Sequence, residues 1–297
     1  MRRAGLSRQY AKLCDLRDFD DPELVARTRE IQQEPDPAVA IERKLWEEGL
    51  LALFMEDVGA LDDRGEILAV GAGREPVLYW LANRAKRVVA TDIYGEGEFS
   101  GREAEVSMLD DPSAHAPFPY REDRLEARWM DARELDFPDA SFDAVYTLSS
   151  IEHFGSPRDI KRAAAEIGRV LRPGGHAFVV TEMLVKLHSI DTAPADFLRR
   201  VATLNRHRRL ATPLRRSYLD DAFKRSELMR RVVRASGLRL KQPLDTTLSP
   251  ESWENLARYA EGSTEIVTPS GSFYPHILLQ VSASVFTSVA LPLQKPV

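Results

Sequence analysis

The sequence predicts an α/β protein built on a doubly wound, mostly parallel sheet. Two observations carry this prediction: apolar runs alternate with helical segments along the middle of the chain, and consecutive runs end in residues that suit a ligand. The run Glu66–Val70 leads into the turn Gly71–Gly73, and the run Val88–Thr91 leads into Asp92. This is the layout of a βαβ unit that binds a nucleotide, with the acid placed to accept hydrogen bonds from a ribose.

The bounds of the other elements are predicted from helix-capping residues and from the prolines and glycines that begin or end a helix. A helix ahead of the first strand is expected to begin at Asp36-Pro37 and to end at Gly59. The pair Ser156-Pro157 repeats the start signal for a later helix, and Arg172–Gly175 ends that helix. The predicted core consists of strands 66–70, 87–91, 125–130, 142–148 and 176–184 with helices 76–85 and 157–171.

The chain is expected to consist of four parts. We expect residues 1–60 to form a helical arm that packs on the core, and residues 61–185 to be the α/β core itself. Residues 186–235 are expected to be a helical insertion that caps the acceptor side, and residues 236–297 to supply the closing strands. Residues 1–35 are either an arm over the site or a loose end, and residues 94–122 are either a substrate-facing loop or an ornamental insertion.

The glycine turn lacks the third glycine of a dinucleotide fingerprint. Pro76 stands at that position, and Glu75 near the helix start would repel a pyrophosphate. A nucleoside cofactor without phosphates fits better, and S-adenosylmethionine is such a molecule. A nicotinamide-dependent oxidoreductase on a similar fold is the enzyme alternative, and a non-catalytic subunit that binds S-adenosylmethionine is the alternative from another class.

Later motifs extend the pattern beyond the first βαβ unit. They are Arg128–Ala132, Phe137–Tyr146, Ser149–Phe154 and Glu166–Gly175. With the glycine turn, they give residues 60–185 an order that resembles the class I S-adenosylmethionine-dependent methyltransferases, in their small-molecule branch. The resemblance implies a seven-stranded sheet that ends in an antiparallel strand pair, with a helical N-terminal arm and an inserted helical cap.

The resemblance also implies a cofactor site at the carboxyl ends of the strands. The glycine turn would lie under the methionine part, the acid after the second strand would bind the ribose, and the acid after the third strand would bind the adenine amino group. The end of the fourth strand would lie beside the transferred methyl group. The cofactor-binding residues are thus expected to be Gly71, Ala72, Gly73, Asp92, Ile93, Asp131, Ala132 and Ser149.

Two residues after the fourth strand are candidates for catalysis. His153 titrates near neutrality and suits a general base toward a hydroxyl group. Glu152 would act by orienting His153, whereas the alternative is that both residues only organise the turn. The histidines lack metal-ligand spacing and Cys14 is the only cysteine, so we expect no metal.

The acceptor is expected to be a small molecule or a glycan-type molecule, methylated at oxygen. The segment Phe197–Tyr218 contains seven arginines and no acid, so it either binds an anionic acceptor or forms an exposed basic face. A net charge of −5 argues against a general nucleic-acid binder. No apolar run has the length of a membrane span or a signal peptide, so a cytoplasmic enzyme is expected.

Overall fold

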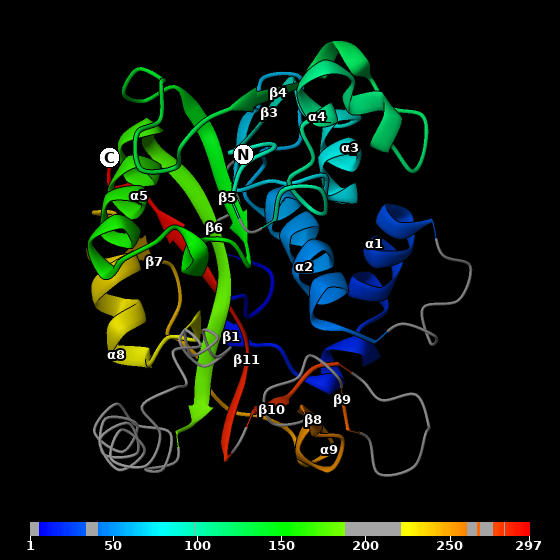
Figure 1. Cartoon of the computed structure of the whole chain (residues 1–297), viewed down its shortest axis with the longest axis vertical. Helices are drawn as coiled ribbons and strands as arrows, with labels where there is room; N and C mark the ends of the chain where they lie inside the picture. The colour runs from blue at the N-terminus through cyan, green and yellow to red at the C-terminus, as the bar shows by residue number, and fades with distance from the viewer. Residues whose placement is uncertain are drawn as a thin grey trace, which may run out of the picture.

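The structure is a computed structural model that describes residues 6–33, 41–97, 99–187, 221–259, 266–267, 276–281 and 283–297. A single sheet runs through it, and helices cover both faces (Figure 1). One buried cluster lies under the helices of residues 22–32, 43–57 and 76–82, and a second lies under the helix of residues 157–170. The expected α/β architecture is confirmed.

The seven central strands have the order β4-β3-β2-β5-β6-β11-β10. The first five are parallel, β11 is antiparallel to β6, and β10 is antiparallel to β11. Strand order therefore reverses beside β2, where doubly wound sheets bind ligands. The bounds are β2 Glu66–Val70, β3 Arg87–Asp92, β4 Leu125–Trp129, β5 Phe142–Leu148, β6 Leu171–Lys186, β10 Leu279–Val281 and β11 Ser284–Gln294.

Four short strands enlarge the sheet beyond the expected seven. Strands β8 (Ala257–Tyr259) and β9 (Ile266–Val267) continue it past β10. Strands β1 (Lys12–Leu13) and β7 (Arg239–Leu240) both pair with β11. The sheet of the described residues thus has 11 strands: β1 and β7 pair with parts of β11 that β10 leaves free, β8 pairs with β10, and β9 pairs with β8.

The helices divide between the two faces as Figure 1 shows. Helices α1, α2 and α3 lie on one face, and α5 and α8 lie on the other. Short α4, α9 and several single-turn helices join them. The bounds are α1 Pro22–Gln32, α2 Arg43–Asp57, α3 Pro76–Ala82, α4 Ser107–Asp110, α5 Pro157–Val170, α8 Arg225–Leu228 and α9 Pro250–Glu254.

The helices before β2 differ from the expectation. Helix α1 begins at Asp21-Pro22, where the Asp21 carboxylate accepts a hydrogen bond from the Glu23 amide at 2.9 Å. Helix α2 begins only at Arg43, because Glu42 is extended with φ −144° and ψ 158°. The predicted start at Asp36-Pro37 was therefore too early for this helix, and those two residues lie outside the described part of the chain.

Helix α5 shows how local sequence and tertiary packing agree. Ser156 caps it, with the Asp159 carboxylate accepting from the Ser156 amide at 2.9 Å in a capping box. Its apolar residues, Ile160 and Ile167 among them, recur at helical spacing and pack on the sheet. In the described part of the chain, no helix combines the length and the apolar character that crossing a membrane requires.

Gly168 in α5 allows an unusually close approach of another segment. A Cβ atom built at this position would lie 1.9 Å from the backbone oxygen of Ser236. In an unconstrained helix alanine is favoured over glycine by roughly 0.5–1 kcal/mol, so the glycine is there for the contact.

We therefore expect Gly168→Ala to lower the free energy of unfolding by about 3 kcal/mol or more, because the backbone of Ser236 must move. Denaturant unfolding of the variant measures this. Lys161→Ala, at an exposed position of the same helix, is the control and should change stability by less than about 0.5 kcal/mol. A stabilised Gly168→Ala variant would show that helix propensity outweighs the contact.

Candidate functional site

The glycine turn after β2 has the backbone geometry that only glycine adopts readily. Gly71 has φ +66° and Gly73 has φ +50°. A Cβ atom on Gly71 would come within 2.7 Å of the Ser150 Cβ, so the turn packs directly on the end of β5. The Ser150 hydroxyl donates to the Gly71 carbonyl at 2.8 Å and fixes that contact.

Asp92 lies next to this turn at the end of β3. Its two carboxylate oxygens accept hydrogen bonds from the amides of Gly73 at 2.9 Å and Ile93 at 2.7 Å. Burial raises the pKa of Asp92 above its ordinary value, and no lysine or arginine of the described residues forms an ion pair with it. Each oxygen keeps a free lone pair, so the group can accept two further hydrogen bonds.

Asp131, which follows β4, has a different environment. The Arg133 guanidinium donates to both of its carboxylate oxygens, at 2.8 and 2.9 Å from Nε. This contact lowers the pKa of Asp131. Ala132 beside it is buried. An adenine amino group at Asp131 would therefore share the carboxylate with Arg133.

The end of β5 is held in a strained conformation. Ser149 has φ +46°, which is uncommon for a residue other than glycine. Its hydroxyl donates to the Glu47 carboxylate of α2 at 2.7 Å, and Ser288 of β11 donates to the same oxygen at 2.6 Å. These two hydrogen bonds hold α2 against the carboxyl ends of the parallel strands, where the ligand site is expected.

Sequence reasoning did not identify the ion pair between Lys44 and Glu75. Lys44 comes from the first turn of α2, and Glu75 stands just before α3. Burial raises the pKa of Glu75 to about 7 in spite of this cation. The buried Tyr146 hydroxyl, whose charged neighbours include Glu75, has no hydrogen-bond partner among the described residues. In the sequence, only the cluster of charged residues at the start of α2 indicated that such an ion pair could form.

His153 lies in the single-turn helix η5 (Ile151–His153) that follows β5. Its ring meets the Phe99 ring edge-on, with the centroids 4.9 Å apart. The Asp221 carboxylate lies 4.0 Å from its Nδ1 atom. The loop at residues 94–122, expected to face the substrate or to be ornamental, thus brings an aromatic residue to His153.

Glu152 is 2% exposed and is directed away from solvent. The Thr181 hydroxyl of β6 donates to its Oε2 atom at 2.8 Å. Burial, together with the nearby charge of Glu182, raises the pKa of Glu152 to about 8. The carboxylate beside the His153 ring is Asp221, which the sequence did not single out because it lies 68 positions along the chain.

Two further expectations concern a metal ion and the arginine-rich segment. The described residues contain no group of three or more histidine, cysteine or acidic side chains that could hold a metal ion. Asp111, an acid of the loop at residues 94–122, caps a short helix by accepting from the Ser113 amide at 3.0 Å. The arginine-rich segment Phe197–Tyr218 lies outside the described residues.

Part of the chain is similar in sequence to known methyltransferases. Residues 68–179 match the family model described as "Methyltransferase domain". The chain is 33% identical over 136 residues, 46% of its length, to 27-O-demethylrifamycin SV methyltransferase of Amycolatopsis mediterranei (strain S699). It is 44% identical over 55 residues, 18% of its length, to phosphatidylethanolamine N-methyltransferase of Cereibacter sphaeroides.

The matches to these two relatives span 45% and 26% of the relatives' own lengths. A solved structure of a SAM-dependent methyltransferase from Methanosarcina mazei is 18% identical, with a TM-score of 0.44, and covers 80% of this chain and 96% of that one. The family match spans β2 to β6, the strands that carry the glycine turn, Asp92 and Ser149. Residues 68–179 therefore match a methyltransferase domain, and S-adenosylmethionine is the cofactor of that kind of domain.

Proposed function

We propose that this protein transfers the methyl group of S-adenosylmethionine to a hydroxyl group of a small-molecule or glycan-type acceptor. The observation that carries the proposal is Asp92, a partly buried carboxylate at the switch point of the sheet with capacity for two more hydrogen bonds and no ion pair among the described residues. A ribose diol supplies two donors in that geometry. The relative from Amycolatopsis mediterranei is named as a 27-O-demethylrifamycin SV methyltransferase, which favours oxygen as the acceptor atom.

The cofactor would lie along the carboxyl ends of β2, β3, β4 and β5. Gly71, Ala72 and Gly73 would lie under its methionine part, Asp92 and Ile93 would contact the ribose and adenine, and Ser149 would lie beside the methyl group. Asp131 and Ala132 would bind the adenine edge, with Arg133 holding the Asp131 carboxylate in place. Glu75 supports a cofactor without phosphates, because its carboxyl group is buried next to the turn.

The chemistry needs a nucleophile in line and a place for its proton. Bound S-adenosylmethionine supplies a methyl group on a sulfonium, so that one C–O bond forms, one C–S bond breaks and S-adenosylhomocysteine leaves. His153 would accept the hydroxyl proton, and Asp221 would stabilise the resulting imidazolium. Phe99 would restrict the orientation of the ring.

Asp92→Ala should weaken S-adenosylmethionine binding by about 1.5–3 kcal/mol, roughly 10- to 150-fold, because hydrogen bonds to a carboxylate are lost. Isothermal titration calorimetry measures the change. Asp63→Ala is the matched control, since that exposed carboxylate precedes β2 at the opposite end of the strand. Equal affinity in the two variants would place the ribose elsewhere.

His153→Gln should lower turnover by about 100-fold or more, while the cofactor dissociation constant stays within about twofold, because a proton acceptor is removed without touching the glycine turn. Release of S-adenosylhomocysteine under saturating cofactor measures turnover. His115→Gln, which alters a histidine bonded to Ser107, is the control. Near-normal turnover of His153→Gln would reduce this histidine to a structural role.

A further inference from the structure

Two acidic side chains, one from α2 and one from the segment after the glycine turn, lie on either side of Lys44. The Lys44 Nζ atom forms an ion pair with Glu75 and lies 3.8 Å from the Glu47 Oε2 atom. Glu75 stands two residues after Gly73, and the Glu47 Oε1 atom accepts from the Ser149 hydroxyl at 2.7 Å. Lys44, Glu47 and Glu75, which we call the α2 cluster, therefore connect the glycine turn with the end of β5.

Both carboxylates of the α2 cluster keep a buried oxygen atom without a hydrogen-bond partner. Among the described residues, neither the Glu47 Oε2 atom nor the Glu75 Oε2 atom accepts a hydrogen bond. The Glu47 side chain is only 2% exposed. The hydroxyl group of the buried Tyr146, whose charged neighbours include Glu75, is unpartnered as well. Because folded proteins rarely leave buried polar atoms unpaired, these three atoms indicate a ligand group that the protein itself does not supply.

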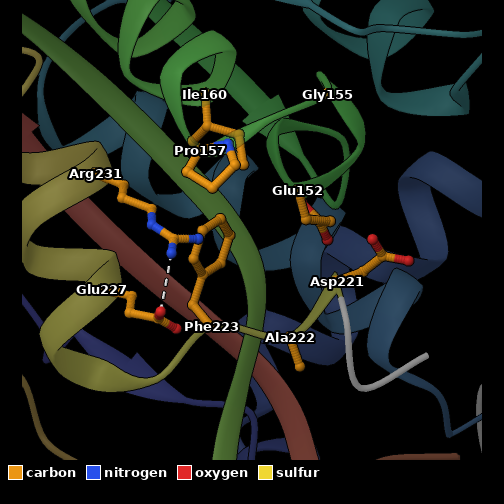
Figure 2. Close-up of a pocket in the computed structure, with 9 residues that line it drawn as sticks. All are labelled: Glu152, Gly155, Pro157, Ile160, Asp221, Ala222, Phe223, Glu227 and Arg231. Atoms are coloured by element: carbon orange, nitrogen blue, oxygen red, sulfur yellow. Dashed lines mark hydrogen bonds and ion pairs between the residues drawn. The ribbon is translucent and has the colours of Figure 1, made fainter. Parts of the chain in front are cut away.

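Another unpartnered carboxylate oxygen belongs to a different place. The Glu152 Oε1 atom also lacks a partner in the described part of the chain, and Glu152 lines a cavity of about 270 Å³ beside η5 (Figure 2). The described lining of that cavity includes no residue of α2, of β2 or of the glycine turn. The cavity is therefore not part of the α2 cluster.

The α2 cluster is also short of positive charge. Burial raises the pKa of Glu75 to about 7 and raises the pKa of the neighbouring Glu48 well above its ordinary value. The charge of Lys44 opposes both shifts without cancelling them. Near neutral pH these carboxyl groups therefore keep protons that a further cation would displace. The missing partner is accordingly a cation that donates hydrogen bonds.

Lys44 gives a ligand access to the cluster and a second point of attachment. Its side chain is 41% exposed, so solvent reaches it. An ammonium group has three N–H donors, and within the described residues the hydrogen bond of Lys44 goes to the Glu75 Oε1 atom. Lys44 can therefore donate to a ligand carboxylate as well. A ligand with an ammonium group and a carboxylate on one carbon atom, an α-amino acid, matches both features.

We propose that the α2 cluster binds the α-amino-acid end of S-adenosylmethionine, with Glu47 and Glu75 accepting hydrogen bonds from its ammonium group and Lys44 donating to its carboxylate. This rests on the proposed function, which puts the methionine part over the glycine turn and the methyl group beside Ser149. Strand β2 ends in the apolar Ala69 and Val70, so it offers no acidic side chain for that ammonium group. Helix α2 is then part of the cofactor site.

The first test isolates the ammonium group of the ligand. Calorimetry compares S-adenosylhomocysteine with its deaminated analogue, in which a hydrogen atom replaces the amino group. The wild-type protein should bind S-adenosylhomocysteine about tenfold or more tightly, because only this ligand donates to the two carboxylates. Equal affinities overturn the proposal. If S-adenosylhomocysteine itself does not bind, the proposed function fails instead, because the site must hold the product of the reaction.

The second test assigns this preference to the α2 cluster. Glu47→Gln and Glu75→Gln should each reduce the preference to about threefold or less by weakening the binding of S-adenosylhomocysteine, because an amide is uncharged and has one acceptor oxygen. Affinity for the deaminated analogue should not fall, which shows that the variants fold. Glu23→Gln, at a side chain that is 70% exposed, is the matched control. An undiminished preference in both cluster variants, or equal losses for the two ligands, overturns the proposal.

Proton release on binding gives an independent readout. A ligand ammonium group favours the ionised form of Glu75, so binding of S-adenosylhomocysteine near pH 7 should release protons, and its affinity should fall as the pH is lowered below about 7. The charged and titratable groups around Glu75 are Lys44, Glu47 and Glu48 of α2, Asp92 of β3, Tyr94 after β3 and Tyr146 of β5.

Calorimetry in two buffers of different ionisation enthalpy measures this release. The Glu75→Gln variant should release fewer protons than the wild-type protein, and so should the wild-type protein with the deaminated analogue. A purely structural role of Glu75 would not link the amino group of the ligand to a proton. Release that is absent from the wild-type protein, or that is undiminished in Glu75→Gln, contradicts the assignment of Glu75.

Discussion

The buried carboxylate of Glu47 is the constraint on which the site depends. It is 1% exposed, and one of its oxygens accepts hydrogen bonds from Ser149 and Ser288. A buried carboxylate requires such partners, so α2 cannot leave the sheet without exposing or orphaning it. Because Ser149 is held in this way, its left-handed backbone is held too, and the chain enters η5 in one direction. The positions of Glu152 and His153 follow from that direction.

The sequence was sufficient for the parts of the fold that local patterns encode. The strand predicted at 142–148 has those bounds in the structure, and Glu66–Val70 is likewise β2. The glycine turn and Asp92 also meet as predicted, because both follow adjacent parallel strands. The pair Asp21-Pro22 carries the same helix-start signal as Asp36-Pro37, but the segment after it is only weakly periodic, so α1 was not predicted.

The contacts that shape the site lie beyond such patterns. Glu47 and Ser149 are separated by 102 positions, and Thr181 and Glu152 by 29. Whether a carboxylate is solvated or buried depends on which distant hydroxyl or cation reaches it, so the sequence could name Glu152 but not the partner that holds it. The same reason explains why Asp221, and not Glu152, is the acid beside the His153 ring.

Strand β11 joins the two ends of the described chain. Lys12 and Leu13 pair with Ala290 and Val289, and the same strand pairs with β6, β7 and β10. During synthesis on the ribosome, the parallel strands can form early, but β6 keeps an open edge until residue 290 has emerged. Such long-range pairing slows folding. Nascent chains that stall before β11 should therefore be the most aggregation-prone species this sequence produces, whatever the stability of the finished protein.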